Sequence, residues 1–445
     1  MELIQNFVSA HNVLISAGIL ILAYIFIAME KIPKVTIALL GAGITIVLGL
    51  VSQIKTVGGV LNPHYFVNFI DFNVIFLLVS MMIIVSIATR SGMFNWIANE
   101  MLKMTKGKPK LILISLAFFT AIVSAFLDNV TTVILIMPVT FVIAKEFDTD
   151  PVPFLITEVL ASNIGGTATL IGDPPNIIIG TRAGLSFMNF VVELTPIVVI
   201  IFLIAVSLLI FLFRKGLKAT PEKMEHVANL DNSKTITNKA LMIRSVVTLA
   251  LVILGFVTHD ITHVSAYVFA VSGASFLLLF EKPKEIYRDV EWLTIFFFVG
   301  LFIIIGGFEA NGGIKYLADQ LIVLTHGSLN AATMIILWAS GILSGIIDNI
   351  PYTATMAPLI EELVSPTNPN AITGATHALW WALSLGACLG GNLTIIGAAA
   401  NVIVSETASS KGYKISFLRF MKYGALVTFI SLLLSSVYLY FKYLR

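Results

Sequence analysis

The sequence predicts an all-α polytopic membrane protein built from two repeats of inverted topology. Three observations support this fold class: an apolar composition, an internal duplication, and an acidic residue at the same position of both copies. Of the 445 residues, 58% are hydrophobic and 12% are charged, and the mean hydropathy is +0.96. Soluble domains carry about twice that share of charge, and runs near the ~20 apolar residues that cross a bilayer recur throughout the chain.

The duplication is visible as segment pairs at a nearly constant offset in residue number. An Asp-Asn pair stands in each copy, and the offset between the two aspartates is 348 − 128 = 220. A later pair of glycine-rich segments has the offset 387 − 162 = 225, so the second copy contains a short insertion. The matched segments are AIVSAFLDNVTTVILIMP (121–138) with GILSGIIDNIPYTATMAP (341–358), 74–98 with 294–318, and SNIGGTATLIGDPPN (162–176) with ACLGGNLTIIGAAAN (387–401).

These offsets divide the chain into two halves. We expect a transmembrane repeat over 1–213, a charged cytoplasmic linker over 214–240, and a second, inverted repeat over 241–445. Lysine and arginine are enriched in cytoplasmic loops, and the basic residues follow this rule only if two segments each enter and leave the membrane on one side. These segments, 111–144 and 329–363, are predicted to be re-entrant hairpins that enter from opposite faces, beside about ten or eleven spans.

Each predicted hairpin carries an ionisable residue at its tip, which is costly inside a membrane unless the residue has a function. A carboxylate, an amide and hydroxyls at the start of a helix offer oxygen ligands to a hard cation and free N–H groups to an anion. Alternatively, Asp-Asn only caps the returning helix, since both residues are strong N-caps. The tip residues predicted to bind a substrate or ion are Asp128, Asn129, Thr131, Thr132, Asp348, Asn349 and Thr353.

A second pair of segments predicts a broken transmembrane helix in each repeat. Paired glycines followed by Asp-Pro-Pro would interrupt a helix, and half-helix ends at the midplane bind ions. Alternatively, the small residues serve close helix packing, which would not explain Asp173 or the proline pair. The candidate binding residues are Asn163, Gly165, Gly166, Thr167, Thr169, Asp173 and Asn176 in the first copy, and Gly390, Gly391, Asn392, Thr394 and Asn401 in the second.

The predicted membrane centre is acidic, because Asp128, Asp173 and Asp348 fall in it and no lysine or arginine does. Such a centre favours binding of H⁺ or Na⁺. For Glu158, a structural role near the cytoplasmic interface is an equal alternative to proton transfer. The candidate proton carriers are Asp128, Asp348, Asp173 and Glu158, and the candidate Na⁺ ligands are Asp128, Asn129, Asp348 and Asn349.

Other classes of site find little support in the sequence. The single cysteine, Cys388, excludes an intrachain disulfide. No nucleophile–base pair or metal-ligand cluster is recognisable, so we predict neither an enzyme nor a bound cofactor. Nothing resembles a phosphate-binding glycine loop, so ATP would have to act through a separate ATPase subunit.

At the hairpin and broken-helix motifs the chain resembles a known group. SAFLDNVTTVILIMPVT followed by EVLASNIGGTATLIGDPPNIIIG is similar to the signature of the arsenical pump membrane protein and pink-eyed dilution protein branch of the ion transporter superfamily. NhaD-type sodium/proton antiporters, citrate transporters and sodium/dicarboxylate symporters are more distant relatives. The resemblance covers nearly the whole chain and implies a central site, elevator-like alternating access and a homodimer. In the dicarboxylate relatives the tips carry Ser-Asn-Thr, a pattern from which Asp128 and Asp348 depart.

The function that the resemblance implies is secondary-active ion transport coupled to H⁺ or Na⁺, with arsenite or antimonite efflux by proton antiport as the first substrate. A single cysteine cannot supply a three-thiolate arsenic site, so arsenite would move as neutral As(OH)₃ held by hydrogen bonds. The alternatives are a Na⁺/H⁺ antiporter, an anion or citrate-like carboxylate transporter, and an anion- or proton-conducting channel. The expected setting is the lipid bilayer of the cell (plasma) membrane, with a small inorganic ion as substrate and no nucleic acid.

Overall fold

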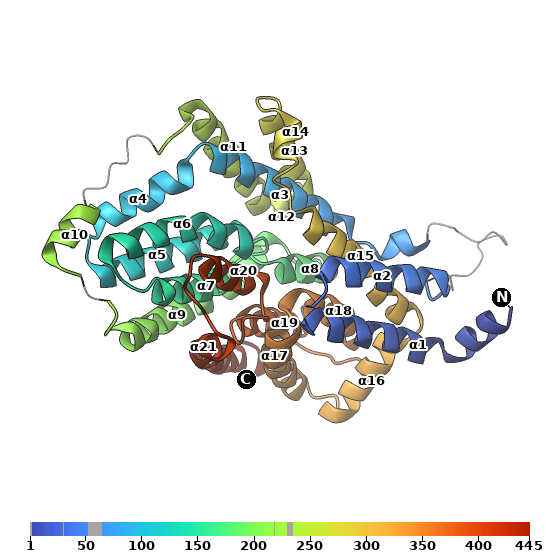
Figure 1. The fold of residues 1–445 in the computed structure, drawn as a ribbon. Helices are drawn as coiled ribbons and strands as arrows, with labels where there is room; N and C mark the ends of the chain where they lie inside the picture. Colours follow the sequence, from blue (N-terminus) through green and yellow to red (C-terminus); the bar gives the residue numbers. More distant parts are fainter. Residues whose placement is uncertain (1, 30, 52–64, 218, 229–234) are drawn as a thin grey trace.

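The computed structural model describes residues 2–29, 31–51, 65–217, 219–228 and 235–445. Within these residues every regular element is a helix (Figure 1), which confirms the all-α prediction. Among them, eight helices are long and apolar enough to cross a membrane. Many of their large apolar side chains are exposed, such as Leu203 at 58% and Leu251 at 60%. Exposed apolar side chains along a helix are expected where the surrounding medium is hydrocarbon.

The first half of the chain forms α1 (Glu2–Met29), α2 (Lys34–Val47), the 3-10 helix η1 (Tyr65–Phe69), α3 (Phe72–Arg90), α4 (Met93–Met104), α5 (Pro109–Ser124), α6 (Asn129–Phe147), α7 (Val152–Gly166), α8 (Pro174–Ala183) and α9 (Phe187–Phe213). The segment predicted as a linker contains a short helix, α10 (Pro221–Ala228), which packs against α4 and α6.

The second half repeats this order of elements. It forms α11 (Lys239–Val257), α12 (His259–Thr262), α13 (Ala266–Leu278), α14 (Pro283–Ile286), α15 (Trp292–Ala310), α16 (Gly313–Thr325), α17 (Leu329–Ile347), α18 (Asn349–Leu363), α19 (His377–Gly390), α20 (Ala399–Ser410), α21 (Phe417–Leu439) and the terminal π-helix η2 (Tyr440–Leu444).

Two antiparallel helix pairs, α5–α6 and α17–α18, form the predicted hairpins. Pro109 starts α5, because a fixed φ and a missing N–H suit the first turn of a helix. Each pair turns at an aspartate, Asp128 or Asp348, which caps the returning helix. The returning helices also share an internal proline, Pro138 and Pro358, which removes one helical hydrogen bond at the same level of both hairpins.

The two predicted broken helices are also confirmed. The first consists of α7 and α8, separated by the non-helical residues 167–173, and the second of α19 and α20, separated by 391–398. Pro174 begins α8 in the place where proline is tolerated. The second break forms without any proline, since Ala399 begins α20.

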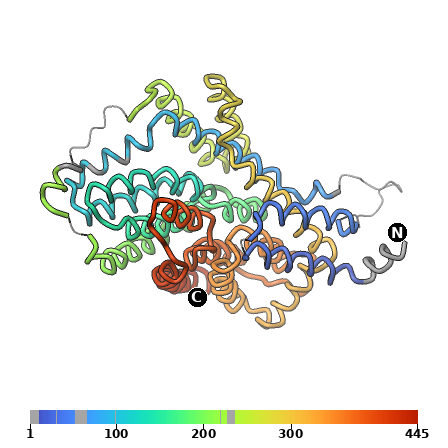
Figure 2. The backbone as a smooth tube through the Cα atoms, in the orientation of Figure 1, coloured from blue at the N-terminus to red at the C-terminus, as the bar shows by residue number. Residues whose placement is uncertain are grey.

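The two repeats are interleaved. Helix α2 packs against α15 and α3 against α13, while α8 packs against α18 and α20 against α6. Figures 1 and 2 show the consequence: the last helices of the chain, in red, lie beside the first hairpin. The backbones of α2 and α15 approach closely, because a Cβ added at Gly300 would lie 2.6 Å from the carbonyl carbon of Ala38. We call α1–α3, α11, α13 and α15 the frame helices, and α5–α9 and α17–α21 the hairpin helices.

Candidate functional site

Both hairpin tips meet the first broken helix at one buried carboxylate, Asp173. Asn129 Nδ2 donates to Asp173 Oδ1 at 3.5 Å, and Asn349 Nδ2 donates to Oδ1 at 3.3 Å and to Oδ2 at 3.1 Å. The two asparagines occupy equivalent positions in the repeats, because 349 − 129 = 220. Asp173 is fully buried, so the two amide groups replace the water that would otherwise solvate its carboxylate.

A chain of amide side chains continues from the first tip to the second broken helix. Asn129 Nδ2 also donates to Asn163 Oδ1 at 3.1 Å. Asn163 Nδ2 in turn donates to Asn392 Oδ1 at 2.9 Å and to Asn401 Oδ1 at 3.0 Å. All four asparagines are buried, and hydrogen bonds in such a low-dielectric interior are strong when every group is paired. One network therefore joins both tips to both breaks.

Asn176 and Asn401 are equivalent residues, because 401 − 176 = 225. Both stabilise the break of their broken helix through the same kind of hydrogen bond. Residues in each break lack helical partners for their carbonyl groups, and the asparagine side chain reaches back to supply donors. The donor–acceptor pairs are Asn176 Nδ2 with the carbonyl oxygens of Gly166 (3.4 Å) and Thr169 (2.9 Å), and Asn401 Nδ2 with those of Gly391 (2.7 Å) and Thr394 (2.8 Å).

Threonine hydroxyls in the breaks fasten each broken helix to the hairpin of the same repeat. Thr169 Oγ1 donates to the carbonyl of Ala125, and Thr394 Oγ1 donates to that of Gly345 at 2.6 Å. Thr167 Oγ1 instead bonds within its own helix, to the carbonyl of Asn163 at 2.8 Å. These candidate binding threonines thus have structural partners in the present conformation.

The matched positions of Gly165 and Gly390 correspond to a close helix crossing. A Cβ added at Gly165 would lie 2.2 Å from the carbonyl oxygen of Ala121, and one added at Gly390 would lie 2.6 Å from that of Gly341. The two contacts are equivalent, because 390 − 165 = 225 and 341 − 121 = 220. Both glycines therefore allow a broken helix to pack on the first helix of its hairpin, α5 or α17. This is the packing role that small residues have in membranes.

Both tip aspartates cap the returning helix, but their second carboxylate oxygens have different partners. Asp128 Oδ1 accepts from the backbone N–H of Thr131 at 3.0 Å, and Asp348 Oδ1 accepts from that of Ile350 at 3.1 Å. Asp128 Oδ2 accepts from Thr131 Oγ1 at 2.5 Å, whereas Asp348 Oδ2 pairs with Lys34 Nζ at 2.5 Å. Capping and ion pairing therefore coexist at the second tip.

Two more predicted tip residues lie in the first turn of the returning helices, and both are buried. Thr132 Oγ1 donates to the carbonyl of Asp128 at 2.9 Å. Thr353 Oγ1 has no hydrogen-bond partner among the residues that the structure describes. Because an unpaired buried hydroxyl is costly, Thr353 is the predicted tip residue with the most evident capacity for a further polar contact.

Lys34 brings a basic side chain to one of the carboxylates of the predicted acidic centre. Lys34 begins α2, and its side chain, 24% exposed, reaches the 2%-exposed side chain of Asp348. The sequence analysis did not single out this lysine, because it lies between two apolar runs and outside the repeated motifs. The duplication gave no signal either, since the equivalent helix α13 begins with Ala266.

A cavity of about 210 Å³, the tip cavity, lies against both hairpin tips. Its lining residues include Asp128, Asp348, Glu291 and Lys34. Glu291, which directly precedes α15, was missed by the sequence analysis. The repeat offset could have drawn attention to it, because the acidic residue Asp71 precedes α3 at the equivalent position, with 291 − 71 = 220, although only the Asp71 side chain accepts backbone hydrogen bonds of its helix.

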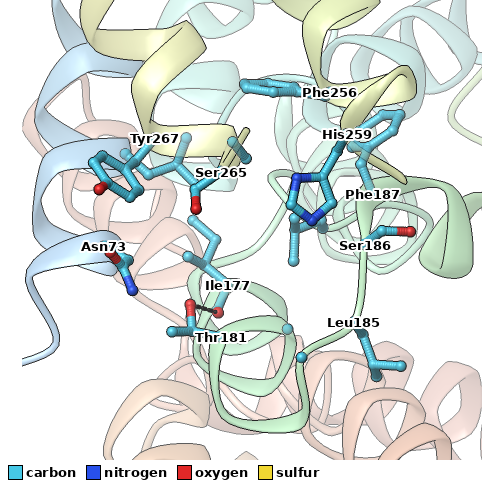
Figure 3. A pocket seen from close by; sticks show the side chains of 15 residues that line it. Asn73, Ile177, Thr181, Leu185, Ser186, Phe187, Phe256, His259, Ser265 and Tyr267 are labelled. Carbon is cyan, nitrogen blue, oxygen red and sulfur yellow. Dashed lines mark hydrogen bonds between the residues drawn. The ribbon is translucent and has the colours of Figure 1, made fainter. Parts of the chain in front are cut away.

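A second cavity, of about 190 Å³, lies between α3, α8 and the start of α13 (Figure 3). Asn73 and Leu77 line it, and both are equivalent to residues that line the tip cavity, since 293 − 73 = 220 and 297 − 77 = 220. Residues 265–267 at the start of α13 also line this second cavity, and residues 33–35 at the start of α2, the helix in the same place of the element order, line the tip cavity. The two cavities are therefore counterparts in the two repeats, and the described tip residues line only one of them.

Glu158 lies apart from the tip cavity. It is buried within α7, and its Oε1 accepts a hydrogen bond from Thr140 Oγ1 of α6. The pair fastens the first broken helix to the returning arm of the first hairpin.

Comparison with known proteins identifies the relatives of this fold. A profile described as "CitMHS: Citrate transporter" matches residues 24–386. An uncharacterized transporter of Mycobacterium tuberculosis (strain ATCC 25618 / H37Rv) is 40% identical over 96% of this chain and 98% of the relative. The P protein of Sus scrofa is 30% identical over 96% of this chain, which spans 59% of that longer relative.

A solved structure shares the architecture. The crystal structure of the Alcanivorax borkumensis YdaH transporter, described as revealing an unusual topology, superimposes with a TM-score of 0.53 and covers 96% of this chain and 97% of that one. At 14% sequence identity this likeness shows the fold alone. Together with the spanning helices and the named relatives, these findings make the chain a multi-pass membrane transporter and not an enzyme. It belongs to the citrate transporter family.

Proposed function

We propose that this protein is a secondary-active transporter whose coupling ion, H⁺ or Na⁺, binds at the two hairpin tips. The observation that carries the proposal is the convergence of Asp128 and Asp348 on one cavity, with Asp173 behind them. Carboxylates among apolar helices are expensive and are kept where they serve transport. Equivalent groups from two repeats that meet beside broken helices are typical of a midplane ion site.

The first substrate candidate is the trivalent hydroxide of arsenic or antimony, exported in exchange for a proton. Its support is the resemblance of the tip and break motifs to the arsenical pump branch. Cys388, the single cysteine, is buried against Asn176, so binding would rely on hydrogen bonds and not on thiolates. Asn129 and Asn349 line the cavity, and their side-chain amides, which donate to Asp173 in this structure, would turn to a neutral As(OH)₃ while one of the nearby aspartates takes up the exchanged proton.

A carboxylate anion is the second candidate, and two observations favour it. Lys34 is among the residues that line the tip cavity, and its ammonium group would compensate one substrate carboxylate once it left Asp348. The family is also described as that of a citrate transporter. The three acidic side chains of the same cavity oppose an anion, so this candidate requires that cations enter with the substrate or before it.

We further propose that the tip cavity opens to the cytoplasm of a cell-membrane protein, with the linker 214–240 on the same side. The positive-inside rule assigns the loop that carries Lys31 and Lys34 to the cytoplasm, and the end of this loop lines the tip cavity. The counterpart cavity of Figure 3 then faces outward. Two such cavities support alternating access, in which the hairpin helices move against the frame helices.

Proteoliposomes with a pH-sensitive dye inside provide the test. Arsenite, Na⁺ and citrate are added separately against an imposed proton gradient. Proton movement on arsenite supports the efflux function, and movement on citrate supports the carboxylate function. A response to Na⁺ alone would make the protein a Na⁺/H⁺ antiporter, and a current without saturation or counter-ion dependence would indicate a channel. Absence of proton or Na⁺ movement with all three additions would contradict ion coupling at the tips.

A further inference from the structure

The two tips are alike in sequence, yet the second carboxylate oxygen of each aspartate has a partner from a different part of the structure. Asp128 Oδ2 accepts from Thr131 Oγ1 of its own hairpin. The equivalent residue of the second hairpin is Pro351, since 351 − 131 = 220, and proline has no hydroxyl. The free oxygen of Asp348 is instead met by Lys34 Nζ at 2.5 Å, from the frame helix α2. A contact within the hairpin has thus been replaced by a contact between hairpin and frame.

The backbone at the second tip is also held in an unfavourable conformation. Asp348 has a φ of +99°, whereas Asp128 has a φ of −62°. A residue with a side chain is disfavoured at such a positive φ and stays there only when its surroundings hold it in place. Strained residues of this kind concentrate at switch regions. The Lys34 ion pair and the cap at Ile350 are the contacts that hold the Asp348 side chain.

A second frame helix holds the same tip. Tyr24 Oη of α1 donates to the carbonyl of Pro351 at 2.6 Å and contacts Thr355 Oγ1. We propose that Lys34 is a tethered cation that holds the second hairpin tip against the frame helices, and that the coupling ion must displace its ammonium group from Asp348 before the tip can leave. This inference rests on the proposed function for the identity of the displacing ion, but the tethering itself does not depend on it.

The burial of Asp348 explains why release requires a replacement cation. The Asp348 side chain is 2% exposed, and a carboxylate at that depth is strongly destabilising once its partner is removed. A coupling ion that binds Asp348 supplies the missing positive charge as Lys34 withdraws. Ion binding and tip release then become one event, so the hairpin does not move while its site is empty. Lys34 is accordingly a positioning residue, and it favours positively charged ions as the trigger.

Thiol cross-linking between α1 and α18 measures the position of the tip without any transport. In a Cys388→Ala background, which contains no other cysteine, Tyr24→Cys and Thr355→Cys place two thiols at side chains that touch. The rate of reaction with a short bifunctional thiol reagent is compared in proteoliposomes. We expect Lys34→Gln to lower this rate about tenfold and Lys34→Arg to preserve it. Lys31→Gln, an exposed lysine of the same loop, is the matched control and leaves the rate unchanged.

A second variant removes the acidic partner of the ion pair. Asp348→Asn keeps an N-cap residue but removes the charge, so it should lower the cross-linking rate as Lys34→Gln does. An unchanged rate in both variants would overturn the inference. The failure of ion coupling has a separate signature: wild-type proteoliposomes would then move neither protons nor Na⁺, while the cross-linking rates would still respond to Lys34→Gln.

Discussion

Asn129 and Asn349, equivalent residues of the two repeats, both donate their side-chain amides to Asp173. The second repeat offers no such acceptor, because Ala398 stands at the position equivalent to Asp173, with 398 − 173 = 225. The internal symmetry of the chain therefore ends at the carboxylate on which its two symmetric tips converge. A single Asp173 serves both repeats and is the first residue to test.

Asp173→Asn is expected to abolish coupled transport. An amide at this position keeps one acceptor oxygen but replaces the other by an NH₂ group, so Asn129 and Asn349, which both donate to Asp173, lose acceptor capacity. Leaving buried donors unpaired costs about 1–3 kcal/mol each, so the thermal midpoint in detergent should also fall. Proton flux in proteoliposomes and thermal unfolding measure the two effects. The control is Asp148→Asn, because the Asp148 side chain is 91% exposed. Normal flux in the Asp173→Asn variant would show that Asp173 does not belong to the transport site.

Asp128→Asn and Asp348→Asn should each abolish coupled transport while the protein stays folded and inserted. Asparagine is as good an N-cap as aspartate, so the hairpin keeps its turn in each variant, but the mutated tip no longer offers a negative charge to H⁺ or Na⁺. Ion-coupled flux and size-exclusion elution check the two parts of this prediction. Normal transport by both variants would remove the tips from the ion-binding site.

Asn176→Ala and Asn401→Ala should each lower the free energy of unfolding by roughly 1–3 kcal/mol. Each change leaves carbonyl groups of a break, at Thr169 or Thr394, without their side-chain donor. Thermal unfolding in detergent measures the loss. Because the two asparagines play equivalent parts, similar losses are expected, and a loss confined to one of them would show that the other break is held by different contacts.

Gly165→Ala and Gly390→Ala should destabilise the protein by about 1–3 kcal/mol through overpacking. Their new Cβ atoms would meet the backbone carbonyl oxygens of Ala121 and Gly341, which cannot move without bending the hairpin. Gly18→Ala is the matched control, because a Cβ there meets nothing within 4 Å. If all three variants unfolded at the same temperature, close packing would not be the reason for the glycines in the breaks.

The hairpins and the broken helices could be predicted because their sequence motifs occur twice in the chain. A lone Asp-Asn pair would have indicated no more than a helix cap, but its recurrence at Asp128 and Asp348 within apolar segments marked both tips. The Gly-Gly and Asn positions of the breaks followed in the same way. Which of these residues pack and which face the cavity could not be inferred, because glycine serves both roles and only the distances to Ala121 and Gly341 distinguish them.

Lys34 and Glu291 were missed for related reasons. Neither lies within a motif, and each stands at the start of a helix, so its place along the chain resembles that of an ordinary loop residue. Their approach to the tips depends on the packing of α2 on α15. This contact joins helices of different repeats, so the sequence near either residue does not indicate it. Lys34 has no counterpart in the second repeat, so even a complete comparison of the two halves would not have indicated it.

The pairing of α2 with α15 also sets the order of events during synthesis. Ala38 and Gly300 touch although their residue numbers differ by 300 − 38 = 262. A ribosome translates such a stretch of chain in roughly 13–50 s at its usual rate. During that interval α2, a helix of 14 residues with a lysine at its start, can pack on α1 but not yet on α15. The packing of α2 is therefore completed only after α15 of the second repeat has been made, and a chain that terminates before α15 is expected to leave that face of α2 without its partner.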